Sequence, residues 1–125
     1  MSFLKKLFGG DFEGSVKKAD GLAEAGRLGE AVLELSEALG RTKGVEPERI
    51  EAARERLATI KDELSRSHVE EGRRLLSEGE LERALDLFET AAEAASSEEV
   101  AEEARALIDN LEAEDARLAL SLIHI

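Results

Sequence analysis

The stretch "VEEGRRLLSEGELERALDLFETA", residues 69–91, decides the fold because it repeats an earlier part of the chain. Residues 16–38, "VKKADGLAEAGRLGEAVLELSEA", align with it at a constant offset of 53 residues. The residues that recur are Val16 and Val69, Leu22 and Leu75, Gly26 and Gly79, Leu28 and Leu81, Ala31 and Ala84, Ala38 and Ala91. Self-similarity at a fixed period indicates an array of units that bury their apolar faces against their neighbours.

The spacing of apolar residues in steps of three and four predicts helices throughout the chain. We expect them near residues 15–26, 28–39, 47–64, 67–78, 81–92 and 100–111. The predicted fold is all-α, with about six helices arranged as antiparallel hairpins in a short stacked array or a helical bundle. Gly26 and Gly29 are expected to form the first turn, and Gly40 is expected to end the second helix in a left-handed conformation.

The third helix has the clearest periodicity, since Ile50, Ala53, Leu57, Ile60 and Leu64 form a narrow apolar stripe. Ser67 and Glu70 match a capping box and predict that a fourth helix begins there, although one unbroken helix from Pro47 is an alternative. Ser96 and Glu99 offer a similar cap for the last helix.

The length and composition predict one soluble domain, residues 13–119, that consists of two copies of about 15–66 and 67–116. Residues 1–45 carry seven Lys/Arg and seven Asp/Glu, whereas residues 46–125 carry ten and 22. This acidic surplus argues against a nucleic-acid partner. With no cysteine, no signal peptide and no apolar run near the roughly 20 residues that span a bilayer, we expect a cytoplasmic protein.

Reactive side chains are few, so we predict no catalytic, cofactor-binding or metal-ligating residues. The chain has two histidines, no cysteine and no glycine-rich phosphate loop after a strand. His68 lies beside Glu70 and Glu71, and the carboxylates of Glu98, Glu99, Glu102 and Glu103 are close in sequence. Such carboxylates on an exposed helix are usually solvated, and the Glu-x-x-His pattern of a di-metal bundle is absent from the sequence.

A family resemblance rests on six residues of the second copy, Gly72, Leu75, Gly79, Ala84, Phe88 and Ala91, and on their counterparts Ala19, Leu22, Gly26, Ala31, Leu35 and Ala38. Their spacing resembles the tetratricopeptide repeat, a helical hairpin with small residues where its helices cross. The chain departs from that pattern in having no aromatic residue early in each hairpin, no closing proline, and an extra helix between the hairpins. The resemblance implies protein binding in a concave groove lined by the first helix of each hairpin.

The N-terminal segment, residues 1–12, is amphipathic if helical, with Phe3, Leu4, Leu7 and Phe8 together and Lys5 and Lys6 opposite. Two interpretations stay open. In the first, the segment makes a weak, reversible contact with the inner face of the membrane and is joined to the domain through Gly9-Gly10. In the second, it has no membrane role and is a cap packed over the first hairpin or a disordered leader.

The C-terminal residues 120–125, "LSLIHI", are apolar in a chain that is otherwise highly charged. The bases CTGTCTCTTATACACATC, which resemble a transposase adapter used for sequencing libraries, translate as these six residues. We therefore expect them to be an artefact and the natural protein to continue beyond residue 119 with a further copy.

Two function classes follow from these observations. The first is a non-enzymatic scaffold that holds a protein partner, as the N-terminal part of a longer protein. The second is a self-associating helical protein that pairs through the stripe of residues 50–64, or an accessory domain of a larger enzyme or signalling protein.

Overall fold

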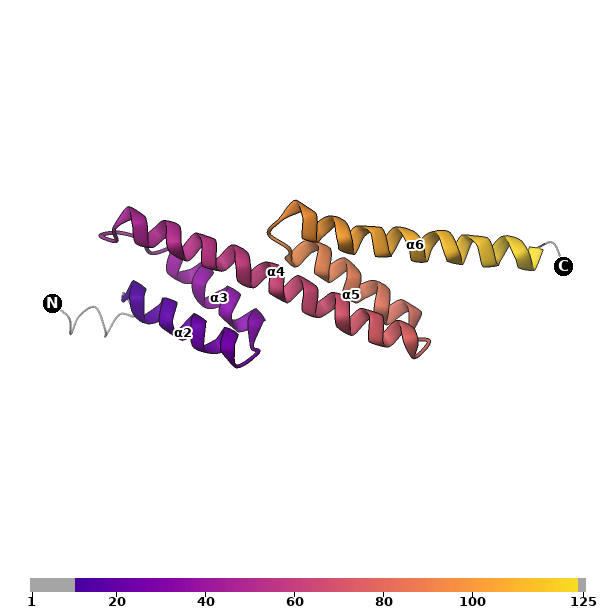
Figure 1. Cartoon of the computed structure of the whole chain (residues 1–125), viewed down its shortest axis with the longest axis horizontal. Helices are drawn as coiled ribbons and strands as arrows, with labels where there is room; N and C mark the ends of the chain where they lie inside the picture. The colour runs from indigo at the N-terminus through magenta and orange to yellow at the C-terminus, as the bar shows by residue number, and fades with distance from the viewer. Residues whose placement is uncertain (1–10, 124–125) are drawn as a thin grey trace. The chain divides into compact units, whose positions relative to one another are not determined.

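The computed structural model describes the backbone of residues 11–123 and the side chains of residues 11–117. These residues form five α-helices and no strand, which confirms the all-α prediction (Figure 1). The helices are α2 (Phe12–Glu24), α3 (Leu28–Leu39), α4 (Pro47–Ser77), α5 (Leu81–Ala94) and α6 (Glu98–Ile123). The chain divides into two compact units, and the boundary between Lys61 and Asp62 falls inside α4.

Helix α4 is unbroken, so the predicted start of a separate helix at Ser67 is wrong and the alternative of one long helix is correct. Ser67 and Glu70 both lie inside α4 and are exposed. Residues 61–68 contain neither glycine nor proline, and each half of the helix packs into the core of its own unit. A helix ends where its backbone is interrupted or its packing stops, and neither happens here. Residues 11–123 therefore hold five helices, close to the predicted number of about six.

The first unit packs α2 and α3 against the first part of α4. Its buried core consists of Phe12, Ala19, Ala31, Leu35, Ala38, Ala53 and Ile60. Ala53 and Ile60 belong to the apolar stripe of α4, and Leu57 packs against the same cluster. A coiled-coil partner on this stripe would have to displace packing within the unit.

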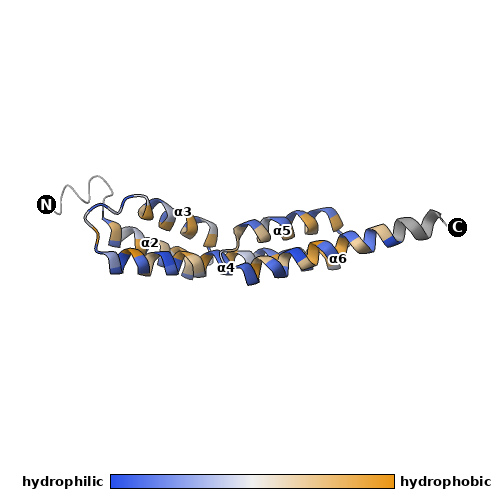
Figure 2. Cartoon of the chain, turned by 90° about the horizontal axis from the view of Figure 1, so that it is seen from above, coloured by the Kyte–Doolittle hydropathy of each residue, from blue (hydrophilic) through white to orange (hydrophobic). Residues whose placement is uncertain are grey.

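The second unit repeats this arrangement with the later part of α4, α5 and α6. Leu75, Ala84 and Phe88 form its central cluster, and Val100, Ala101 and Ala104 of α6 are also buried. The fully buried Ser65 hydroxyl donates a 2.7 Å hydrogen bond to the carbonyl oxygen of Ala91, so its burial leaves no polar atom unpaired. Helices α3 and α5 carry hydrophilic residues along one side and hydrophobic residues along the other (Figure 2).

Glycines in the left-handed region form the turns, although not all at the expected places. Gly26 and Gly79 occupy matching positions of the two hairpin turns, with φ of 81° and 80°. Gly29 lies inside α3, so it is not part of the first turn. The prediction for Gly40 is also wrong, because its φ is −81° and α3 ends in a right-handed turn in which the Arg41 N–H bonds the Ala38 carbonyl. Gly44, with φ of 79°, reverses the chain later in the loop.

The N-terminus of α6 is capped by Ser97, rather than by Ser96. The Ser97 hydroxyl oxygen accepts a 3.2 Å hydrogen bond from the Val100 N–H. Asp62 of α4 adds a cap from another helix, since its Oδ1 accepts hydrogen bonds from the N–H groups of Ser96, at 2.8 Å, and Ser97, at 3.0 Å. Partial burial alone would raise the pKa of Asp62, but these two bonds and the Ser97 side chain, with the charge of Arg66, lower it overall.

Candidate functional site

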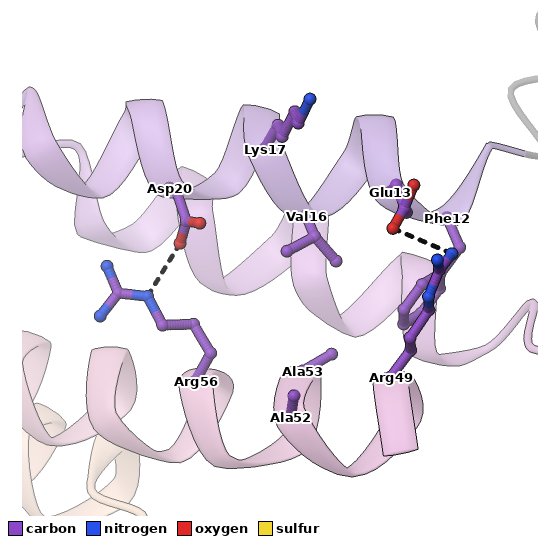
Figure 3. Close-up of a pocket in the computed structure, with 9 residues that line it drawn as sticks. All are labelled: Phe12, Glu13, Val16, Lys17, Asp20, Arg49, Ala52, Ala53 and Arg56. Atoms are coloured by element: carbon purple, nitrogen blue, oxygen red, sulfur yellow. Dashed lines mark hydrogen bonds and ion pairs between the residues drawn. The ribbon is translucent and has the colours of Figure 1, made fainter. Parts of the chain in front are cut away.

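A groove runs between α2 and the first part of α4, within the first unit, and has a volume of about 370 Å³ (Figure 3). Its apolar lining comes from Phe12 and Val16 of α2 and from Ala52 and Ala53 of α4. Phe12 and Val16 are four residues apart and share one face of α2, whereas Ala52 and Ala53 are consecutive on α4 and lie between Arg49 and Arg56. The alanines make it hollow, because a larger side chain at Ala52 would fill the space.

Charged residues flank this apolar lining and bridge the two helices. Arg49 Nη1 lies 2.9 Å from Glu13 Oε1, and Arg56 Nε lies 2.8 Å from Asp20 Oδ1 (Figure 3). On each helix, the two residues that form these ion pairs are seven positions apart, which is about two turns. The two ion pairs are therefore about 10.5 Å apart along the groove. Lys17 of α2 adds a fifth charged group at the rim.

The four ion-pair residues are partly exposed, with 36% to 58% of each side chain accessible to solvent. Pairs of this kind contribute only about 0.2–1 kcal/mol each to stability. They can therefore exchange partners at little cost when another molecule approaches the groove. The arrangement suits the capture of an apolar side chain between two sets of charged groups.

The first-copy residues of the repeat motif lie in the core and turn of the first hairpin. Ala19, Ala31, Leu35 and Ala38 are buried, Leu22 is half-buried and packs against them, and Gly26 makes the turn. The structure thus brings these six residues together for packing. They do not form the lining of the groove.

The second-copy residues occupy the corresponding places in the second unit. Gly72, Leu75, Ala84, Phe88 and Ala91 are buried, and Gly79 makes the turn. Gly72 and Phe88 are in direct contact, since a Cβ atom on Gly72 would lie 2.6 Å from the Phe88 ring. Small residues on α4 and α5 therefore let these helices approach closely around one large ring.

The carboxylates considered as cation ligands are engaged in ion pairs or solvated. Arg105 Nη1 donates hydrogen bonds to Glu98, at 2.8 Å, and to Glu102, at 2.9 Å. The first of these bonds lowers the pKa of Glu98 and raises that of Arg105. Among the described residues, no three His, Asp or Glu side chains are grouped to hold a metal ion, and His68 is half-buried.

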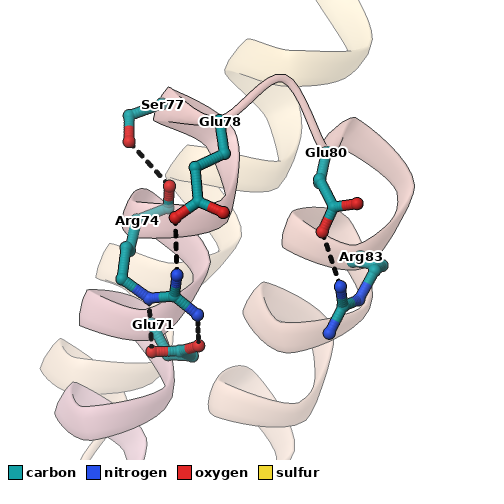
Figure 4. A network of polar contacts seen from close by, with 6 residues as sticks. All are labelled: Glu71, Arg74, Ser77, Glu78, Glu80 and Arg83. Carbon is teal, nitrogen blue, oxygen red and sulfur yellow. Dashed lines mark hydrogen bonds and ion pairs between the residues drawn. The ribbon is translucent and has the colours of Figure 1, made fainter.

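A second polar cluster lies where α4 ends and α5 begins (Figure 4). Arg74 bonds Glu71 and, at 2.5 Å, Glu78, while Arg83 bonds Glu80 at 2.5 Å. The hydrogen bonds between Arg74 and Glu71 lower the pKa of Glu71 and raise that of Arg74. These are exposed pairs between residues three or four apart, which support their own helices and enclose no binding space.

The membrane-contact candidates Phe3, Leu4, Lys5, Lys6, Leu7 and Phe8 lie outside the described residues. Among the helices that the structure describes, none combines the length and the apolar character needed to cross a bilayer.

Sequence reasoning identified the packing residues but not the groove. Its ion pairs join Glu13 to Arg49 and Asp20 to Arg56, which are 36 residues apart in both cases. The sequence does contain a pattern that is consistent with this groove. Two acidic residues are seven positions apart on one helix, two arginines are seven positions apart on another, and small apolar residues lie between the arginines. Only the pairing of the two helices shows that these patterns face each other.

No protein-family model matches this chain, and no curated protein or solved structure matches it at the threshold applied.

Proposed function

We propose that this protein is a non-enzymatic interaction scaffold of the tetratricopeptide-repeat type, and that the groove between α2 and α4 binds a short apolar segment of a partner protein. The observation that carries this proposal is the apolar lining of Phe12, Val16, Ala52 and Ala53, held between the Arg49–Glu13 and Arg56–Asp20 ion pairs.

The packing of the two hairpins supports the repeat part of the proposal. Buried small residues stand where the helices cross, with one large side chain beside them in each unit, Leu35 in the first and Phe88 in the second. The groove supports the binding part, because its walls are the first helix of the first hairpin and the helix that continues into the second hairpin. The resemblance implies a groove lined by the first helix of each hairpin; this groove shares with it the first helix of the first hairpin, α2, whereas its other wall is residues 49–56 of α4.

The dimensions of the groove limit what it can hold. The two ion pairs that flank its apolar lining are about two helical turns apart, which leaves room for one or two large side chains such as Phe or Leu. Full burial of each such side chain contributes about 1.5–3 kcal/mol, before the cost of immobilising the ligand. We therefore expect an isolated peptide to bind more weakly than about 1 μM, with tighter binding only where a partner also contacts the rim charges.

The experiment is a selection of peptides from a random library on the full chain, followed by affinity measurements on two matched variants. Ala52→Arg places a bulky charge in the groove, whereas Ala106→Arg makes the same change at another exposed helical alanine, on α6 in the second unit. The proposal predicts peptides rich in large apolar residues that lose at least about tenfold in affinity for Ala52→Arg, equivalent to about 1.4 kcal/mol, and bind Ala106→Arg normally. Peptides whose affinity is the same for both variants would contradict the assignment of the groove.

A further inference from the structure

We propose that the groove between α2 and α4 is the docking site of the chain's own N-terminal segment, residues 3–8, which competes there with a partner. This inference rests on the proposed function, because it treats the groove as a site that binds peptides. It adds that the N-terminal segment occupies the site when no partner is bound.

The segment joins the described structure at the end of the groove. Phe12, the first residue of α2, is buried and lines the groove, and Asp11 precedes it. Gly9 and Gly10 separate the segment from this point. Glycine adopts positive and negative φ with similar ease, so this pair permits the chain to reverse and run back along α2.

The length of the segment is close to that of the groove. A helix of residues 3–8 measures about 9 Å, at about 1.5 Å per residue. The two ion pairs that flank the apolar lining are seven residues apart on each helix, or about 10.5 Å. After a reversal at Gly9-Gly10, the segment therefore spans most of the distance between the two ion pairs.

The apolar side chains of the segment complement the groove. Phe3, Leu4, Leu7 and Phe8 share one face of a helix, and the groove offers an apolar lining between its two ion pairs. Lys5 and Lys6 fall on the opposite side, so docking of the apolar face leaves both ammonium groups in solvent.

Tethering favours this occupant over a separate molecule. A short flexible linker gives an effective concentration in the millimolar range. If the segment binds the groove with an intrinsic Kd of about 1 mM, the tethered segment occupies the groove in a substantial fraction of chains. The segment of a second chain at micromolar concentration occupies the groove only rarely. Occupation lowers the apparent affinity for a partner by the fraction of chains with an open groove.

The first test is disulfide trapping in the full chain, which has no cysteine of its own. The double variant Leu4→Cys with Ala52→Cys is oxidised at low concentration and compared with Leu4→Cys with Ala106→Cys. Docking predicts rapid, nearly complete formation of an intramolecular bond in monomers of the first pair, and slow formation in the second. Equal rates for both pairs, or a bond found only in dimers, would overturn the proposal.

The second test uses a chain in which Phe3, Leu4, Leu7 and Phe8 are all changed to Ser. Docking predicts altered backbone amide NMR signals at Val16, Lys17 and Ala52, and an increase of about twofold or more in affinity for the selected groove peptides. Unchanged amide signals would refute it. Binding of the wild-type chain, but not the serine variant, to anionic vesicles, with the groove signals unchanged by the substitutions, would assign the segment to a membrane instead.

These results separate the two proposals. Groove peptides that bind the wild-type chain and the serine variant equally, with loss in Ala52→Arg, would retain the proposed function and remove the internal occupant. Trapping between residues 4 and 52 without any peptide that depends on Ala52 would retain the internal contact and remove the proposed function.

Discussion

Gly72 on α4 lies against the ring of Phe88 on α5, so closely that a Cβ atom on the glycine would be 2.6 Å from Cε1 and 2.9 Å from Cδ1 of the ring. The matching residues of the first unit, 53 positions earlier, are Ala19 and Leu35, and both are fully buried. The two copies thus fill matching core positions with different pairs of residues: Gly and Phe in the second unit, and Ala and Leu, which belong to one buried cluster, in the first.

Gly72→Ala is expected to destabilise the protein by about 1–3 kcal/mol, because the fully buried Phe88 ring has no space to move away. Phe88→Leu alone is also destabilising, since it leaves a cavity. The double variant reproduces the pair found in the first unit, so its loss should fall short of the sum of the single losses by about 0.5–3 kcal/mol. Urea unfolding followed by circular dichroism measures these values, as the chain has no Trp or Tyr for fluorescence.

Gly21→Ala is the control for this series. Gly21 lies in α2, and apart from its chain neighbours and the backbone of its own helix, no atom is within 4 Å of the position of its Cβ. The better helix propensity of alanine should therefore stabilise this variant by about 0.5–1 kcal/mol. If Gly72→Ala behaved like Gly21→Ala, or if the double variant showed simple additivity, the contact between Gly72 and Phe88 would not limit the packing.

The two turn glycines should tolerate substitution equally poorly. Gly26 and Gly79 have positive φ with open space around them, so the cost of an alanine there is conformational and not steric. We expect Gly26→Ala and Gly79→Ala to lose about 1–2 kcal/mol each in the free energy of unfolding. Gly29→Ala, inside α3 and equally open, should have no cost. Equal stability of all three variants would show that the turns accept other conformations.

The contribution of Asp62 to the free energy of unfolding should depend on pH. Because its pKa is lower in the folded state than the usual value of 3.8, the ionised carboxylate stabilises the fold above that pH, and this contribution disappears as the pH falls through the folded-state pKa. Asp62→Asn keeps an oxygen that can accept these hydrogen bonds but removes the charge. It should therefore lose about 0.3–1 kcal/mol at pH 7, the range for a charge at a helix terminus, and progressively less below about pH 4.

The measurement for Asp62 is the difference in the free energy of unfolding between the wild type and the variant from pH 7 to pH 3. Glu63→Gln, an exposed neighbour on α4, is the control and should differ little from the wild type at any pH. A difference for Asp62→Asn that stayed constant with pH would mean that the charge of Asp62 plays no part in capping α6.

The all-α fold was predictable because the apolar spacing of each helix is local. The errors arose where local rules compete with packing. Ser67 and Glu70 have the residue types of a capping box, yet α4 continues because both of its halves are buried against other helices. Gly40 follows a helix, as a left-handed glycine often does, but the chain reverses at Gly44 instead.

The candidate site was less predictable, because its geometry depends on contacts between distant residues. Arg56 meets Asp20 across 36 residues, and Asp62 caps a helix that begins 36 residues later. Neither contact leaves a pattern within one helix. Copy-to-copy comparison located Gly72 and Phe88, because packing residues recur with the repeat, whereas the groove residues Glu13 and Arg49 belong to one copy only.

The continuity of α4 has a consequence for how the protein is made. Starting a helix is the unfavourable step, and adding residues to an existing end is much easier. Once the first unit has folded, residues 47–61 are already helical, and the helix of residues 62–77 can grow directly from that end. The ribosome delivers the two units in the same order, so during synthesis the first unit provides a template for the second before α5 and α6 emerge.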